Sequence, residues 1–117
     1  RPLVSRNTIK RCFVKAEKKG AAIPVIDICE SIRHIEKAGN HMVDRDKYKI
    51  VQTPQIFKSE LLIRAFKKPY SDSFTDDASV VESIGQEISL VEGNPENIKI
   101  TGKLDMIVAE AYFKYFE

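Results

Sequence analysis

Short runs of strand-type residues alternate with helical patterns along this chain, and this alternation constrains the fold more than any other feature. Near the start, Ser5 can cap a helix that ends at Gly20. The apolar positions that share one face of this helix are Ile9, Cys12, Phe13 and Ala16. The apolar run "AAIPVI" at 21–26 then predicts a strand covered on both faces, although Pro24 argues against a fully paired central position. Strands that alternate with helices indicate an α/β layered sheet with parallel components.

The alternation continues to the end of the chain. The stretch at 48–57 has strand character, and its strand is expected to end at Pro54. The elements expected after it are a helix at 60–68, a helix at 76–85, a strand at 86–93 and a last helix. The residues expected to cap or open these helices are Ser59, Thr75 and, for the last helix, Gly102 and Asp105. The apolar stripe of the last helix consists of Leu104, Ile107, Val108, Ala111, Tyr112 and Tyr115.

The stretch from 27 to 45 is different, because it is polar and contains few apolar residues. Gly39-Asn40 marks a turn within it, so we interpret the stretch as a β-hairpin arm that leaves the globule. A short helix over 29–37 is the alternative, since Ile28, Ile32 and Ile35 also fit a helical spacing. An arm that buries so little by itself needs a partner surface, and a second copy of the chain is the simplest candidate.

Composition excludes several classes of function. The 117 residues carry 19 basic and 17 acidic side chains, so no strong overall field favours nucleic acid or a membrane surface. Seven of the first twenty residues are basic, but Phe13 is the single aromatic residue among them and provides no interleaved series for base stacking, so a solvated helix face is the preferred interpretation. No apolar run is long enough to span a bilayer. Two cysteines, Cys12 and Cys29, without metal-type spacing suit a reducing cytoplasm.

Three polar residues lie just past expected strand ends or at an expected helix start, namely Thr53, Thr75 and Lys99. Open α/β sheets bind ligands beyond the carboxyl ends of their strands, so these residues can converge on one crevice. Hydroxyls at helix N-termini together with a lysine suit a phosphate, and Arg1 and Arg45 are further candidate partners. A plain N-cap for Thr75 and a solvated lysine for Lys99 remain open alternatives.

Four motifs in register resemble one enzyme family. "RPLVSRNTI", "VDRDKYKIVQTPQIF", "FTDDASVVESIG" and "VEGNPENIKIT" together are similar to 2-C-methyl-D-erythritol 4-phosphate cytidylyltransferases. The resemblance runs from Arg1 to about Glu110 and concerns the C-terminal half of that family. It implies a Rossmann-like nucleotidyltransferase fold of the glycosyltransferase-A-like type. Residues 1–117 would be the C-terminal half of a single cytidylyltransferase domain, with 27–45 as a protruding dimerisation arm and the CTP-binding loop outside the chain.

The resemblance also implies roles for particular residues. Lys99 would be catalytic, and the substrate-binding positions would be Arg1, Ser31, Arg45, Thr53 and Thr75. Ser31 stands where the family usually has threonine, and Glu30 replaces the usual aspartate before it. Arg45 would reach the substrate phosphate in the neighbouring subunit of a homodimer. No metal ligand is expected in this half, and Mg²⁺ would be bound together with CTP.

The implied reaction is cytidylyl transfer from CTP to 2-C-methyl-D-erythritol 4-phosphate, which yields 4-diphosphocytidyl-2-C-methyl-D-erythritol and pyrophosphate in non-mevalonate isoprenoid synthesis. The 117 residues alone are expected to be inactive. Three alternatives remain: a ribitol-5-phosphate cytidylyltransferase, a non-catalytic dimerisation fragment, and a small nucleic-acid-binding domain that uses the basic first helix.

Overall fold

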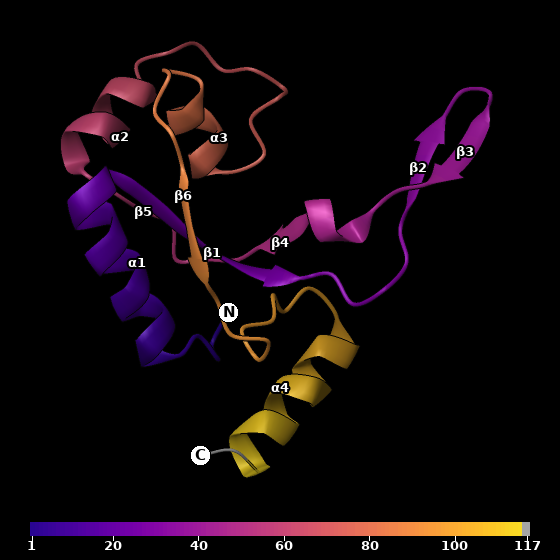
Figure 1. Ribbon diagram of the computed structural model, residues 1–117. Helices are drawn as coiled ribbons and strands as arrows, with labels where there is room; N and C mark the ends of the chain where they lie inside the picture. The colour runs from indigo at the N-terminus through magenta and orange to yellow at the C-terminus, as the bar shows by residue number, and fades with distance from the viewer. Residues whose placement is uncertain (116–117) are drawn as a thin grey trace.

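The computed structural model describes residues 1–115, which form a four-stranded sheet flanked by helices, together with a separate two-stranded hairpin (Figure 1). The elements are, in order, α1 (Arg6–Lys19), β1 (Ala21–Asp27), β2 (Arg33–Glu36), β3 (Gly39–Met42), a short 3-10 helix η1 (Arg45–Lys47), β4 (Lys49–Val51), β5 (Ile56–Phe57), α2 (Ser59–Ala65), α3 (Asp77–Glu82), β6 (Ser89–Glu92) and α4 (Lys103–Tyr115). β6 pairs parallel with β1, whereas β4 and β5 pair antiparallel along its other side. The expected α/β sheet with a parallel component is confirmed.

Helix α1 begins and ends as the sequence predicts. The hydroxyl of Ser5 accepts a hydrogen bond from the backbone N–H of Thr8 at 3.0 Å, and Gly20 ends the helix with a φ of 96°. The buried face consists of Thr8, Cys12 and Ala16, and burial raises the pKa of the Cys12 thiol. Phe13 was expected on this face, but it is 60% exposed. The smaller side chains at four-residue spacing face the sheet instead, and they allow the helix to approach it closely.

Strand β1 lies at the centre of the sheet, but Pro24 does not occupy a fully paired position in it, as the sequence predicts. The carbonyl oxygen of Pro24 accepts a hydrogen bond from the backbone N–H of Gln52 at 2.9 Å. The N–H and C=O of one strand residue point to the same side, so the N–H that proline lacks would face the gap between β4 and β5. A proline is tolerated there because the ladder is already interrupted.

The stretch at 48–57 was expected to be one strand that ends at Pro54, but pairing stops at Val51 and resumes at Ile56. Residues between these points form an irregular loop, which we call the rim loop (52–55), and it contains a cis peptide bond between Thr53 and Pro54. The register shifts by two residues across the rim loop, since Val25 pairs with Val51 whereas Ala22 pairs with Ile56.

Helices α2 and α3 pack on one face of the sheet, where Ala21, Ala65, Val80 and Val81 form a buried cluster. Their caps differ from the sequence-based expectations. The N-cap of α2 is Lys58, and Ser59 is the first helical residue.

The N-cap of α3 is Asp76 rather than Thr75. The carboxylate of Asp76 accepts from the N–H of Ser79 at 2.8 Å, and the hydroxyl of Ser79 accepts from the N–H of Asp76 at 3.2 Å. This reciprocal pair is a capping box, in which the N-cap residue lies three positions before its partner. Ser79 therefore pairs with Asp76, and Thr75 lies one residue too early.

The arm is a hairpin, as preferred over a helix at 29–37. β2 and β3 pair antiparallel and every residue in them is exposed. Figure 1 shows the hairpin projecting from the sheet on two chain segments, a loop after β1 and the segment that contains η1 before β4. Ile35 and Met42 are each 74% exposed, so the hairpin offers apolar surface that nothing in residues 1–115 covers.

Helix α4 forms where the sequence predicts, but its apolar stripe is not buried. Ala109 is the buried residue of α4, whereas Leu104 is 72%, Ile107 63% and Tyr115 69% exposed. In Figure 1 α4 lies beyond the carboxyl end of β6, away from the faces of the sheet. No helix within residues 1–115 is both long and apolar enough to cross a membrane.

Candidate functional site

The rim loop is the structural centre of the candidate site. The side chain of Gln52 is only 2% exposed and turns toward the turn that follows β6. Its Nε2 donates to the carbonyl oxygen of Asn94 at 2.9 Å, and its Oε1 accepts from the backbone N–H of Asn94 at 3.3 Å. The two bonds fix the rim loop against residues 93–97, which lie about forty positions further along the chain.

Asn97 extends this contact to two of the predicted site residues. Its side chain is fully buried, and its Nδ2 donates to the carbonyl oxygen of Thr53 at 2.7 Å. The guanidinium of Arg1 donates through Nη1 to the backbone carbonyl of Asn97 at 2.5 Å and through Nη2 to that of Val51 at 3.4 Å. Partial burial lowers the pKa of Arg1. Arg1 and Thr53 are therefore both held against Asn97.

Lys99 follows Asn97 by two residues, and its side chain is exposed. The sequence placed it just past a strand at 86–93, and β6 does end at Glu92, after which an irregular segment leads to Lys99. This segment contains a turn closed by a hydrogen bond from the Asn97 N–H to the carbonyl of Asn94, at 3.0 Å. Ile98 and Ile100 on either side are half-buried, so the backbone at Lys99 is anchored while its ammonium group is free to meet an anion.

The other end of the rim loop reaches the start of α3. Gln55 donates through Nε2 to the carboxylate of Asp76 at 2.9 Å and accepts from the backbone N–H of Ala78 at 3.0 Å. Thr75 lies directly before this cap, is exposed, and donates its N–H to the hydroxyl of Ser79 at 3.0 Å. Because Gln52 and Gln55 belong to one short loop, the segments that carry Thr53, Thr75 and Lys99 are connected through it.

Ser31 and Arg45 belong to the arm and not to this network. Both are exposed, and Arg45 donates through Nη1 to the carbonyl oxygen of Cys29 at 2.6 Å. This bond closes the base of the arm. Within one copy of the chain, the contacts made by Gln52, Asn94 and Asn97 do not include either residue.

Sequence reasoning missed four amide residues that organise the site, namely Gln52, Gln55, Asn94 and Asn97. The available signal was their position on both sides of prolines, in "QTPQ" and "GNPEN". Amide side chains can donate and accept at once, so they can satisfy the backbone groups that an irregular, proline-containing segment leaves without ladder partners.

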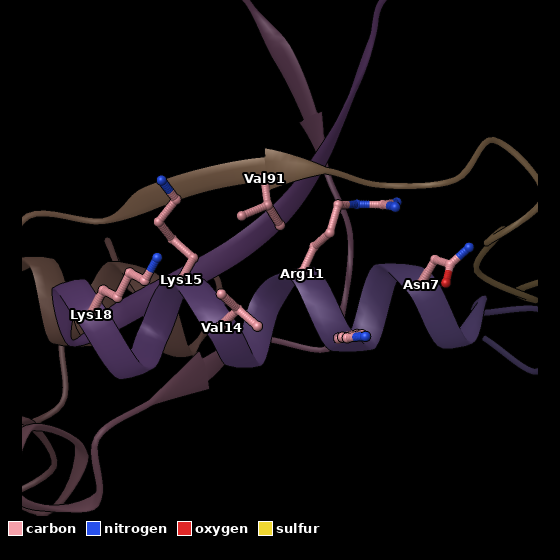
Figure 2. A pocket seen from close by; sticks show the side chains of 7 residues that line it. Asn7, Arg11, Val14, Lys15, Lys18 and Val91 are labelled. Atoms are coloured by element: carbon pink, nitrogen blue, oxygen red, sulfur yellow. The ribbon is translucent and has the colours of Figure 1, made fainter.

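Apart from this network, a hollow lies between α1 and β6, with a volume of about 400 Å³ (Figure 2). The described residues that line it are Asn7, Lys10, Arg11, Val14, Lys15, Lys18 and Val91. Arg11 is already engaged, since its Nε donates to the carbonyl oxygen of Glu92 at 2.8 Å. The lining lacks the aromatic side chains that stack on bases, which weighs against the nucleic-acid alternative.

No group of three or more His, Cys, Asp or Glu within residues 1–115 is placed to hold a metal ion. The cationic and hydroxyl groups of Arg1, Lys99, Thr53 and Thr75 are of the kind that bind anions, and buried amides hold the segments that carry them.

Comparison with known proteins identifies the family. The family model of 2-C-methyl-D-erythritol 4-phosphate cytidylyltransferase matches residues 1–115. A protein of that name from Phocaeicola vulgatus is 53% identical over 110 residues, and the match covers 94% of this chain and 50% of the relative. One from Bacteroides fragilis is 52% identical over 111 residues, covering 95% of this chain and 51% of the relative. The chain thus spans about half the length of the curated relatives it matches.

Solved structures of the same family agree with this match. The crystal structure of 2-C-methyl-D-erythritol 4-phosphate cytidylyltransferase from Thermus thermophilus superposes with a TM-score of 0.85 at 34% identity, covering 97% of this chain and 58% of that one. The Francisella tularensis enzyme gives a TM-score of 0.82 at 30% identity, covering 95% and 54%. The family model, the curated relatives and the solved structures lead to one conclusion: the chain belongs to the 2-C-methyl-D-erythritol 4-phosphate cytidylyltransferase family.

Proposed function

We propose that the protein of which this chain forms part transfers the cytidylyl group of CTP to 2-C-methyl-D-erythritol 4-phosphate. An oxygen of the sugar phosphate attacks the α-phosphorus of CTP and forms a new P–O bond. The bond from the α-phosphorus to the bridging oxygen breaks, and pyrophosphate leaves. The observation that carries the proposal is the family match over residues 1–115, on a chain whose segments around Arg1, Thr53 and Lys99 are tied into one network.

In this proposal the chain supplies the sugar-phosphate side of the site. Arg1, Thr53 and Thr75 bind the substrate phosphate or its hydroxyls, and Lys99 stabilises the negative charge that develops on the phosphoryl oxygens. The exposed ammonium of Lys99 on an anchored backbone supports this role. In this proposal Mg²⁺ is bound together with CTP, where it would neutralise charge on the triphosphate oxygens.

The arm completes the site in a homodimer. Ser31 and Arg45 then contact the substrate phosphate held by the neighbouring subunit. The exposed apolar residues Ile35 and Met42 on the hairpin support an arm that packs on a second copy. A reducing cytoplasm is the proposed location, and the free state of both Cys12 and Cys29 supports it.

The test is an assay of the full-length protein with CTP and a panel of sugar phosphates. We expect pyrophosphate release and a product of the mass of 4-diphosphocytidyl-2-C-methyl-D-erythritol with the methylerythritol substrate. Preference for ribitol 5-phosphate would instead identify the sister reaction. The 117-residue chain alone is expected to be inactive, and turnover by it would contradict the view that the CTP-binding loop is supplied by other residues.

A further inference from the structure

We propose that Asn97 is a positioning residue that sets Arg1, Thr53 and Lys99 relative to one another. The inference rests on the proposed function, since these three residues are its candidate phosphate and charge partners. Asn97 holds the first two by direct hydrogen bonds and begins the segment that carries the third.

Asn97 acts through its neighbours because its side chain is fully buried and is not accessible to a ligand. Its Nδ2 lies 2.7 Å from the carbonyl oxygen of Thr53, and its own carbonyl receives the guanidinium of Arg1. A bound phosphate that meets Arg1 and Thr53 therefore meets groups whose separation Asn97 fixes. Displacements of about 1 Å in such groups can cost about a hundredfold in rate.

The remaining atom of this side chain argues against a role in stability alone. Oδ1 of Asn97 is buried and has no hydrogen-bond partner among the described residues. A buried acceptor without a partner costs about 1–3 kcal/mol. This cost offsets part of what the bond from Nδ2 to Thr53 contributes to stability, and a buried polar group without a partner calls for an explanation, of which a role at a site is one.

Thr8 provides a matched control in the same part of the molecule. The buried polar or charged residues of the described chain are Thr8, Gln52 and Asn97. The hydroxyl of Thr8 donates to Oδ1 of Asn94 at 2.9 Å, so Thr8 supports the same turn from α1. It does not hydrogen-bond Arg1, Thr53 or Lys99 in the described chain, and Asn94 keeps its bonds to the N–H of Ser5 and to Gln52 without it, so its loss should lower stability while the turn stays in place.

The experiment compares Asn97→Leu with Thr8→Val in the full-length protein. Leucine fills a similar volume, removes the donor to Thr53 and removes the unpartnered acceptor. We expect the KM for the sugar phosphate to rise by about tenfold or more, with the KM for CTP within about threefold of wild type. For Thr8→Val we expect a lower melting temperature, with both KM values within about threefold.

The outcomes separate this inference from the proposed function. An inactive wild-type protein overturns both. An active wild type in which Asn97→Leu shifts both KM values equally, or behaves like Thr8→Val, overturns the positioning role alone. Should Asn97→Leu fail to fold, Asn97→Ala, which also removes the donor to Thr53 but adds no bulk, is judged by the same split between the two KM values.

Discussion

Gln52 and Asn94 are joined by two hydrogen bonds, one from the side-chain amide of Gln52 to the Asn94 carbonyl and one back from the Asn94 N–H, although 42 positions separate them in the chain. This pair brings the rim loop to the turn after β6. Thr53 lies directly after one partner, and Asn97 and Lys99 shortly after the other. The geometry of the candidate site therefore depends on contacts around these two amides.

Gly93→Ala should disturb this contact. A Cβ on Gly93 would overlap Oε1 of Gln52 and lie 3.2 Å from the carbonyl oxygen of Val25. Gln52 is hydrogen-bonded and buried, so it cannot move aside freely, and we expect a loss of about 1–3 kcal/mol in the free energy of unfolding. Urea denaturation of the full-length protein measures this change in the free energy of unfolding. In Gly102→Ala the new Cβ would meet only Asp105 Oδ2 at 3.9 Å, so this control should stay within about 0.5 kcal/mol.

Lys99→Ala should lower the turnover of the full-length protein by a few hundredfold, about 3 kcal/mol, because in the proposed mechanism Lys99 supplies a preorganised charge at the transferred phosphoryl group. Lys103→Ala is the control, since Lys103 is also exposed and lies close in sequence at the start of α4. Steady-state rates of Lys99→Ala within about threefold of wild type, or a similar loss in both variants, would remove Lys99 from the mechanism.

Arg45→Ala should raise the KM for the sugar phosphate and leave the KM for CTP nearly unchanged, since the proposed contact is to the sugar phosphate. Arg33→Ala is the control, because Arg33 is an arm arginine that already donates to Asn40 within the hairpin at 2.8 Å. Equal effects of Arg45→Ala on both substrates would contradict the assignment.

Mixed dimers test whether the arm acts on the neighbouring subunit. Arg45→Ala and Lys99→Ala subunits, mixed in equal amounts and allowed to exchange, should recover about one quarter of wild-type activity, because half of the dimers are mixed and each has one intact site. If Arg45 acts within its own subunit, every site in the mixture lacks one group. Activity of the mixture that stays at the level of the two separate variants would therefore contradict an arm that acts on the neighbouring subunit.

The start of α4 should respond to acid. The pKa of Asp105 is lowered by hydrogen bonds from the backbone N–H and hydroxyl of Thr101 and from the N–H of Gly102, at 2.9–3.0 Å. A carboxyl group whose pKa is lower in the folded state stabilises that state at pH values above the ordinary pKa of the group, which is near 3.8 for aspartate. This contribution is lost as the pH falls through the folded-state pKa.

We therefore expect Asp105→Asn to be less stable than wild type at neutral pH, with the difference shrinking below pH 3.8. Denaturation curves at neutral and acidic pH measure this. Thr101→Val removes the hydroxyl donor and should reduce the pH dependence. A difference that is independent of pH would mean that the charge of Asp105 contributes nothing to the cap.

The sequence by itself determined the local elements and the family. Ser5 and Gly20 bound α1, the polar stretch with Gly39-Asn40 forms a hairpin, and the four motifs lie in the family they resemble. These features depend on neighbours within a few residues or on extended sequence similarity, and both can be detected without knowing what packs against what.

Tertiary structure alone decided which surfaces are buried and which residues meet. The stripe of α4 has the helical period yet stays exposed, because burial requires a facing element and period alone does not supply one. Pro24 occupies a central strand because the ladder on one side of it is interrupted. Asn97 reaches Thr53 and Arg1 across 44 and 96 positions, and such contacts arise only when distant segments fold together.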